Sequence, residues 1–192
     1  MTLLFPPKPV TTRQKFAFRA VLPVRQTSFW KIETGIVRTL TWQEDGTVVA
    51  LGIWGAGALV GGPLVKTDPY QIECLTPVEA VDLQVTDWSQ FTDTLLQQWH
   101  CSEELMVIRS YRKTDLMLIK LLGWLAGRFG SAVDQGQLID LRLTHQDLAE
   151  LLSTTRVTIT RTLSQLEQQG FIYRRSLGRI VLREEEFWHY EI

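Results

Sequence analysis

Residues 144–172 of the chain read THQDLAELLSTTRVTITRTLSQLEQQGFI and contain the signals of two short helices. Thr144 is a favourable residue at the start of a helix, and the acidic Asp147 lies in the turn that follows it. Small and apolar residues then recur at helical spacing. After a short break a second helix is expected from about 155 to 169, with Gly170 as its C-terminal stop. Two helices joined by a three- or four-residue turn form a helix-turn-helix.

The second predicted helix has two different faces. Its apolar face carries Ile159, Leu163 and Leu166, and the opposite face carries Val157, Thr160, Arg161 and Ser164, with Arg156 on the flank. Arginine pairs with guanine through two hydrogen bonds, and an apolar side chain contacts the thymine methyl group. We therefore expect Arg156 and Arg161 to contact bases in the major groove of DNA. The alternative is a surface helix with two solvated arginines.

The residues after Gly170 predict a basic hairpin. Two strand-like pieces in FIYRRSLGRIVL (171–182) flank a turn at 176–178, and arginines surround the turn. Such a wing meets phosphates, which position a protein on DNA without specifying sequence. Residues 142–183 carry seven arginines against three acidic residues, whereas the whole chain has a net charge of −1. The residues expected at the DNA are Thr144, His145, Gln146, Thr155, Arg156, Val157, Thr158, Thr160, Arg161, Arg174, Arg175 and Arg179.

The N-terminal half is typical of antiparallel β-structure. Short runs rich in Val, Ile, Thr and aromatic residues occupy 16–24, 28–32, 35–42, 47–54, 70–75 and 78–85. The sequence Glu44-Asp45-Gly46 is a strong hairpin signal between two of them. A glycine-rich stretch follows at 55–63. These runs predict a sandwich or barrel.

Helices are expected between these two parts. Residues 89–112 predict a helix of about 24 residues, which corresponds to about 36 Å. A helix of this length with an apolar stripe often pairs with a copy of itself; the residues expected to do so are Phe91, Leu95, Trp99 and Met106. A second apolar helix at 114–129, a loop at 130–137 and a strand at 138–143 follow. The fold class is α+β, in three parts: 1–88, 89–113 and 114–192.

This order of parts resembles the Crp/Fnr family of transcription regulators, the cyclic-AMP receptor and fumarate–nitrate regulator family. The resemblance covers nearly the whole chain and is strongest over 138–182. STTRVTITRTL (153–163), LTPVEA (75–80) and RFG (128–130) are similar to the cyanobacterial global nitrogen regulator subgroup. The family arginines match Arg156 and Arg161, while Val157 replaces a glutamate common among relatives. The resemblance implies a jelly-roll β-roll, a homodimer, a palindromic GTA-N8-TAC site, and RNA polymerase as a possible partner.

The β-roll departs from the family pattern where effectors bind. Cyclic-AMP binders carry a Gly-Glu pair and then an Arg-Ser pair; here the matching stretch has Gly61-Gly62 and then Asp68. The arginines with which the nitrogen regulator holds its 2-oxoacid match Asp68 and Gln98. Both changes remove positive charge that an anionic effector needs. We expect neither cyclic AMP nor 2-oxoglutarate to bind in the family's way, which leaves another ligand or a purely structural roll.

Other functions find little support in the sequence. His100, His145 and His189 are scattered, and 55–63 lacks G-x-G-x-x-G spacing, so we expect no enzyme and no catalytic residues. Cys74 and Cys101 are isolated, which argues against a metal site or cofactor. There is neither an apolar run of about eighteen residues nor a signal peptide, so a cytoplasmic protein is expected. The open alternatives are a ligand-gated regulator with an unfamiliar effector, and a protein-interaction module that has lost DNA binding.

Overall fold

Two antiparallel four-stranded sheets form the N-terminal part of the computed structural model, which describes residues 13–84 and 88–183. Their orders are β1-β8-β3-β6 and β2-β7-β4-β5, and we call this pair of sheets the β-roll. Its fully buried side chains include Leu22, Phe29, Ile32, Ile53 and Ile72. The strands are β1 Arg13–Phe16, β2 Val21–Leu22, β3 Ser28–Thr34, β4 Val37–Trp42, β5 Val48–Trp54, β6 Leu59–Val60, β7 Tyr70–Cys74 and β8 Val78–Gln84, with a 3-10 turn η1 at Gly62–Leu64.

The strand pattern of the β-roll is confirmed with one correction. The hairpin predicted at 44–46 joins β4 to β5, and the Asp45 carboxylate accepts a hydrogen bond from the Thr47 amide at 2.8 Å. The single strand expected at 16–24 is wrong, because β1 pairs with β8 in one sheet and β2 with β7 in the other. The chain changes sheets at Arg19, whose φ of 64° lies in the left-handed region.

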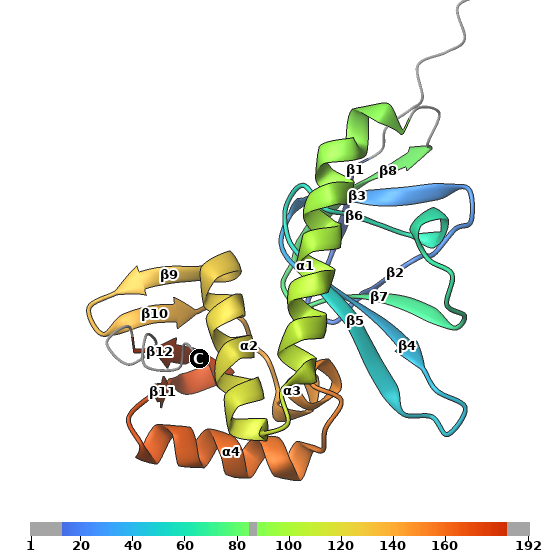
Figure 1. Cartoon of the computed structure of the whole chain (residues 1–192). Coiled ribbons are helices and arrows are strands. Elements are labelled where there is room, and N and C mark those ends of the chain that lie inside the picture. The colour runs from blue at the N-terminus through green and yellow to red at the C-terminus, as the bar shows by residue number, and fades with distance from the viewer. Residues whose placement is uncertain (1–12, 85–87, 184–192) are drawn as a thin grey trace, which may run out of the picture.

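One long helix lies alongside the β-roll (Figure 1). This helix, α1, spans Thr92–Ser110 and follows a 3-10 turn, η2, at Ser89–Phe91. Its 19 residues correspond to about 28 Å, so the predicted 24-residue helix was too long. The helix ends because Tyr111 adopts an extended backbone conformation with ψ of 135°. None of the helices among the described residues could cross a membrane.

The C-terminal part combines three helices with a small sheet of order β11-β12-β10-β9. The loop predicted at 130–137 is wrong, because β9 and β10 form a hairpin there. Gly136 has a φ of 134°, and a Cβ at this position would lie 2.0 Å from the Leu182 carbonyl oxygen, so only glycine fits. The elements are α2 Thr114–Phe129, β9 Gly130–Val133, β10 Gly136–Ile139, α3 His145–Leu151, α4 Arg156–Gln168, β11 Ile172–Arg174, η3 Ser176–Gly178 and β12 Ile180–Leu182.

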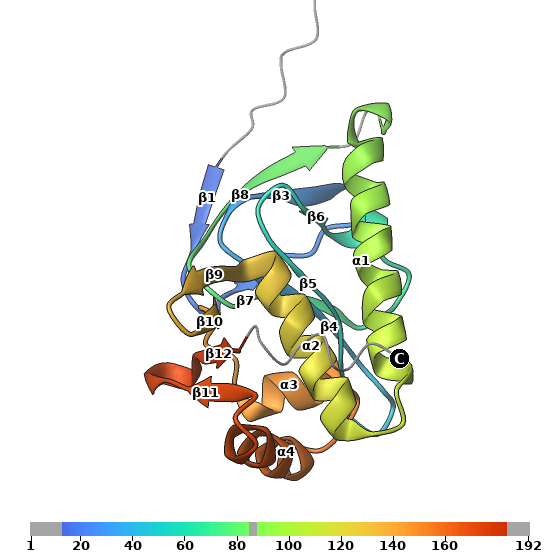
Figure 2. The same cartoon turned by 60° about the vertical axis from the view of Figure 1, so that its left-hand side comes forward.

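The helical core continues into the β-roll. Leu40 and Ala50 of the roll belong to the same buried cluster as Leu148 and Leu151 of α3 and Leu122 of α2. Helix α3 packs directly on β5. In both views α4 lies at the end of the molecule opposite β3 and β8 (Figures 1 and 2). The limits of the three predicted parts remain a prediction.

Candidate nucleic-acid interface

Helix α3 begins with a reciprocal capping box. The Thr144 hydroxyl accepts a hydrogen bond from the Asp147 amide at 3.1 Å, and the Asp147 carboxylate accepts one from the Thr144 amide at 2.7 Å. Each bond satisfies a backbone donor that a helix start would otherwise leave without a partner. The turn to the next helix passes through Ser153, whose φ is 50°. The structure therefore confirms the first half of the predicted motif.

Helix α4 turns its predicted apolar side inward. Ile159, Leu163 and Leu166 are buried, whereas Val157 is 67% exposed. Thr155 caps the helix by accepting a hydrogen bond from the Thr158 amide at 3.1 Å. The outer side also exposes Thr155, Arg156, Thr160 and Arg161, and Thr158 is half-buried. A row of donors and one apolar side chain thus faces away from the core.

A direct contact joins the two helices of the motif at this surface. His145 Nδ1 lies 2.7 Å from the Thr160 hydroxyl, which also donates to the Arg156 carbonyl at 2.9 Å. Partial burial, followed by the positive charges of Arg174 and Arg156, holds the pKa of His145 below its ordinary value. The imidazole is therefore neutral near pH 7. Its surroundings are electropositive, as a phosphate-binding surface requires.

The wing arginines are less free than the sequence suggested. The Arg174 guanidinium donates to Glu167 of α4 through Nε at 2.7 Å, and this hydrogen bond holds the pKa of Glu167 below its ordinary value. Arg179 Nε lies 2.5 Å from an Asp140 carboxylate oxygen. Arg175 is exposed, and no ion pair engages it within the described chain. Of the three wing arginines, Arg175 is therefore the one most available to a phosphate.

The four residues expected in a degenerate effector pocket are only partly brought together. Gly61 and Gly62 are buried, and a Cβ on Gly61 would lie 2.8 Å from Phe29 Cα. Asp68 is exposed on the following loop. The Gln98 side chain of α1 is hydrogen-bonded to the backbone of β6. Its Oε1 accepts a hydrogen bond from the Leu59 amide at 3.0 Å, and its Nε2 donates one to the Leu59 carbonyl at 2.9 Å.

A cavity of about 470 Å³ does lie beside these residues. It is open to solvent and lies between the β-roll and α1, and its lining includes Leu95, Gln98 and Trp99 from the helix and Lys66 and Tyr70 from the roll. Sequence reasoning missed Lys66 and Tyr70. Burial raises the pKa of the Tyr70 hydroxyl well above its ordinary value, so the phenol stays neutral. Lys66 is the only charged side chain among the described residues that line this cavity.

Of the four residues predicted on the dimer helix, Phe91 lies in the preceding turn η2, and Leu95, Trp99 and Met106 lie on α1. Phe91 packs edge-on against Phe29 of the roll with ring centroids 5.4 Å apart, and Leu95 lines the cavity. Trp99 also borders this cavity but is largely exposed to solvent, as are Met106 and two residues that the sequence interpretation missed, Leu96 and Val107. These four side chains are between 52% and 62% exposed, and we call them the α1 stripe. Spacings of three, seven, eight and eleven positions along the helix place them on one face.

Comparisons with known proteins agree with this arrangement. Residues 118–186 match the model of the Crp-like helix-turn-helix domain. The regulatory protein CysR of Synechococcus elongatus is 41% identical over 194 residues, which covers 97% of this chain and 93% of that protein. The global nitrogen regulator of a Nostoc species is 35% identical over 67% of this chain and 64% of its own length.

Two solved structures share the fold. A transcriptional regulator of the CRP family from Thermus thermophilus superposes with a TM-score of 0.77 at 19% identity, covering 89% of this chain and 92% of that one. FixK2 from Bradyrhizobium japonicum gives a TM-score of 0.75 at 18% identity, covering 94% and 96%. With a β-roll, a long helix and a Crp-like helix-turn-helix in this order, the chain belongs to the Crp/Fnr family of transcriptional regulators.

Proposed function

We propose that the protein is a cytoplasmic homodimer that places α4 in the major groove of a specific DNA site. The observation that carries this proposal is the outer side of α4. Arg156, Val157 and Arg161 are exposed there, and the two arginines have no ion-pair partner within the described residues. Donors of this kind, aligned on a capped and rigid helix, are what base recognition requires. Thr144, His145 and Gln146 at the start of α3, with Arg175 of the wing, would meet phosphates.

The α1 stripe supports the homodimer. Leu96, Trp99, Met106 and Val107 form an exposed apolar face on a helix whose opposite face is buried against the roll. Apolar residues at these spacings pair across parallel helices. A twofold axis along α1 would then present two copies of α4 to one face of DNA. The half-sites of a palindrome would lie about one helical turn apart, about 34 Å.

The proposed site is a GTA-N8-TAC palindrome. It rests on the similarity of 153–163 to the global nitrogen regulators, a similarity that the relatives' overall identity supports. Because Val157 stands where relatives carry a glutamate, the base pair next to the arginine contacts is expected to be read through a methyl group rather than through a cytosine amine.

We further propose that neither cyclic AMP nor 2-oxoglutarate controls the protein. Gln98 is occupied by the backbone of Leu59, and Asp68 adds a negative charge on the neighbouring loop. None of the described arginines lines the 470 Å³ cavity. A dianionic effector would therefore lack the bidentate partners that such ligands use.

A ligand-gated regulator is the second candidate. A cavity of about 690 Å³ lies where the loop Gly55–Ala58 faces Gln97 of α1 and Arg128 of α2. The position of this cavity between the roll and two helices supports control by an uncharacterised small molecule. Binding of such a ligand would shift populations only if its affinity differs between two arrangements of the helices.

The test is a titration of labelled duplex DNA with the purified full chain at two salt concentrations. A GTA-N8-TAC duplex bound at least tenfold more tightly than a scrambled duplex, with affinity falling as salt rises, supports the proposal. A dimeric protein that binds neither duplex, with or without a cell extract of small molecules, would favour the protein-interaction module instead.

A further inference from the structure

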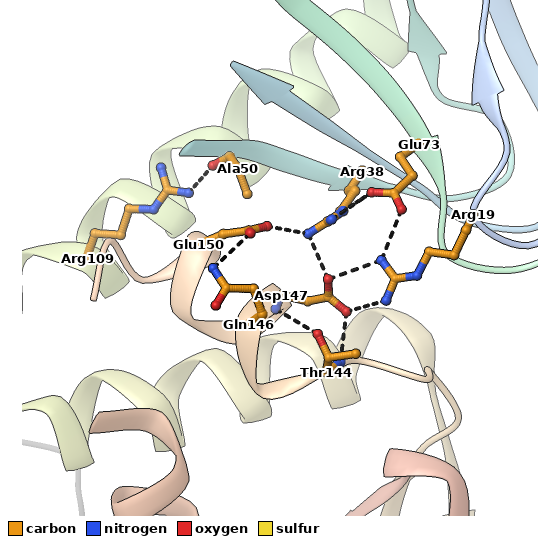
Figure 3. A network of polar contacts seen from close by, with 9 residues as sticks. All are labelled: Arg19, Arg38, Ala50, Glu73, Arg109, Thr144, Gln146, Asp147 and Glu150. Carbon is orange, nitrogen blue, oxygen red and sulfur yellow. Dashed lines mark hydrogen bonds and ion pairs between the residues drawn. The ribbon is translucent and has the colours of Figure 1, made fainter. Parts of the chain in front are cut away.

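A cluster of buried charges joins the β-roll to the first helix of the DNA-binding motif (Figure 3). Arg38 lies at its centre, on β4. Its guanidinium donates to Glu150 of α3 at 2.7 Å and lies 2.9 Å from a carboxylate oxygen of Asp147, also on α3. On its other side it bonds to Glu73 of β7 at 2.7 Å through Nε. One side chain of the roll thus forms ion pairs with two carboxylates of α3.

A second arginine repeats this contact from the turn where the chain changes sheets. The two terminal nitrogens of Arg19 donate to the two carboxylate oxygens of Asp147 at 3.1 and 2.6 Å. Arg19 also reaches Glu73 at 3.2 Å, so that Glu73 bridges both arginines. Bidentate pairing of this kind fixes the relative orientation of the two groups as well as their distance.

A third arginine ties the same helix to α1. Arg109, near the C-terminal end of α1, donates through Nε to the Leu151 carbonyl at 2.6 Å, where α3 ends. Its Nη2 donates to the Ala50 carbonyl of β5. Both carbonyls belong to elements outside α1, so Arg109 joins α1, α3 and the roll at one point. Helix α3 is therefore held by the roll at Asp147 and Glu150 and by α1 at its C-terminus.

Because these charged side chains are buried, their contacts restrict the movement of α3 relative to the β-roll. The side chains of Arg38, Asp147 and Glu150 are each 9% exposed or less. A small slide or rotation of α3 would leave charges buried but unpaired, which is costly. The apolar core that α3 shares with Leu40 and Ala50 opposes complete separation. The ion pairs and the shared apolar core therefore both favour the observed orientation of α3 on the roll.

We propose that Arg19, Arg38 and Arg109 are positioning residues for DNA binding. None lies on the outer face of α4. They act by fixing the helix-turn-helix relative to α1, and hence the separation of the two α4 helices across the dimer axis. This inference rests on the proposed function as a dimeric DNA-binding protein. It explains how a regulator with a degenerate effector pocket would hold a DNA-competent arrangement by itself.

The experiment compares wild type with Arg38→Met and Arg19→Gln on three duplexes whose half-sites are separated by seven, eight or nine base pairs. The matched control is Arg25→Gln, which removes an arginine paired with Asp82 inside the roll. We expect wild type and control to prefer one spacer at least tenfold. The two cluster variants should bind that duplex at least tenfold more weakly and discriminate between spacers less than threefold. Binding to a single half-site should stay within threefold of wild type, which a general loss of folding would not allow.

A second measurement is independent of DNA. Spin labels at Glu44→Cys and Gln168→Cys, both exposed positions, report the distance between the roll and α4 within one protomer when diluted with unlabelled protein. We expect one narrow distance distribution in wild type and a broader one in Arg19→Gln, the less buried of the two cluster substitutions. A narrow, unchanged distribution in folded Arg19→Gln and Arg38→Met would overturn the inference. If wild type binds no DNA, the proposed function fails while the label distances still test the positioning role.

Discussion

Arg19 and Asp147 are 128 positions apart in the chain, yet they form a two-bond ion pair that links the β-roll to the helix-turn-helix. The same Asp147 carboxylate closes the capping box of α3 through the Thr144 amide. One side chain therefore serves both the local start of the helix and its attachment to the rest of the protein.

Acidification should weaken the attachment. Burial raises the pKa of Asp147, but the hydrogen bonds from Arg19 and the Thr144 amide, with the charges of Arg38 and Arg19, outweigh it and hold the pKa below its ordinary value. A depressed pKa means that this contribution to the free energy of unfolding is complete above the unfolded-state pKa of about 4 and is lost as pH falls through the folded-state pKa. Urea unfolding between pH 3 and pH 7 measures it.

The matched variants for this prediction are Asp147→Asn and the exposed Asp93→Asn. Removing one partner of a buried ion pair typically costs about 3–5 kcal/mol, so Asp147→Asn should be strongly destabilised at pH 7 and should show a weaker loss on acidification. Asp93→Asn should follow wild type at every pH. Equal acid sensitivity in the two variants would contradict the assignment to Asp147.

The capping box makes a separate prediction about stability. Thr144→Ala removes the acceptor for the Asp147 amide, and we expect it to lower the free energy of unfolding by about 1 kcal/mol. Thr144→Ser keeps the oxygen and should stay close to wild type. Chemical denaturation distinguishes them; an alanine variant as stable as the serine variant would show that the hydroxyl contributes nothing.

We expect the His145 imidazole to become protonated when the protein binds DNA. In the free protein its pKa is held low by burial and by two arginines, so the imidazole is neutral near pH 7. A nearby phosphate would raise that pKa, and affinity for DNA should then increase as pH falls from 8 to 6. Duplex titrations across this range should show the increase in wild type. The trend should be reduced in His145→Gln, and an unchanged trend there would exclude His145 from phosphate binding.

The α1 stripe predicts the oligomeric state. Trp99→Glu places a charge in the centre of the proposed interface and should convert a dimer to a monomer without changing the circular dichroism spectrum, because Trp99 is exposed within the protomer. Gln97→Glu adds a charge to the same helix outside the stripe and should remain dimeric. Light scattering after size exclusion measures both masses, and a monomeric wild type at micromolar concentration would reject the homodimer.

The helix-turn-helix was predictable because its signals are local. Capping at Thr144 and the inward spacing of Ile159 and Leu163 depend on residues within one or two helical turns. The β9–β10 hairpin escaped prediction because GSAV and GQLI lack an alternating apolar pattern. The partition of 16–24 between two sheets depends on partners at least fifty residues away.

The candidate site shows the same division. The exposure of Arg156 and Arg161 followed from helical periodicity alone. The cluster around Arg38 and Asp147 could not be predicted, because long-range ion pairs leave no periodic trace in a single sequence. The pairing of Arg174 with Glu167 spans only seven positions, but it joins β11 to α4 and so follows neither a helical nor a strand period.

Base reading by α4 is tested by comparing the binding of wild type, Arg161→Ala and Arg13→Ala to the GTA-N8-TAC and scrambled duplexes. Arg13 is exposed on β1, far from α4. If α4 reads the bases, Arg161→Ala should lose about 1–3 kcal/mol of discrimination per half-site, while Arg13→Ala retains the wild-type preference. An Arg161→Ala protein that distinguishes the two duplexes as well as wild type would contradict the account.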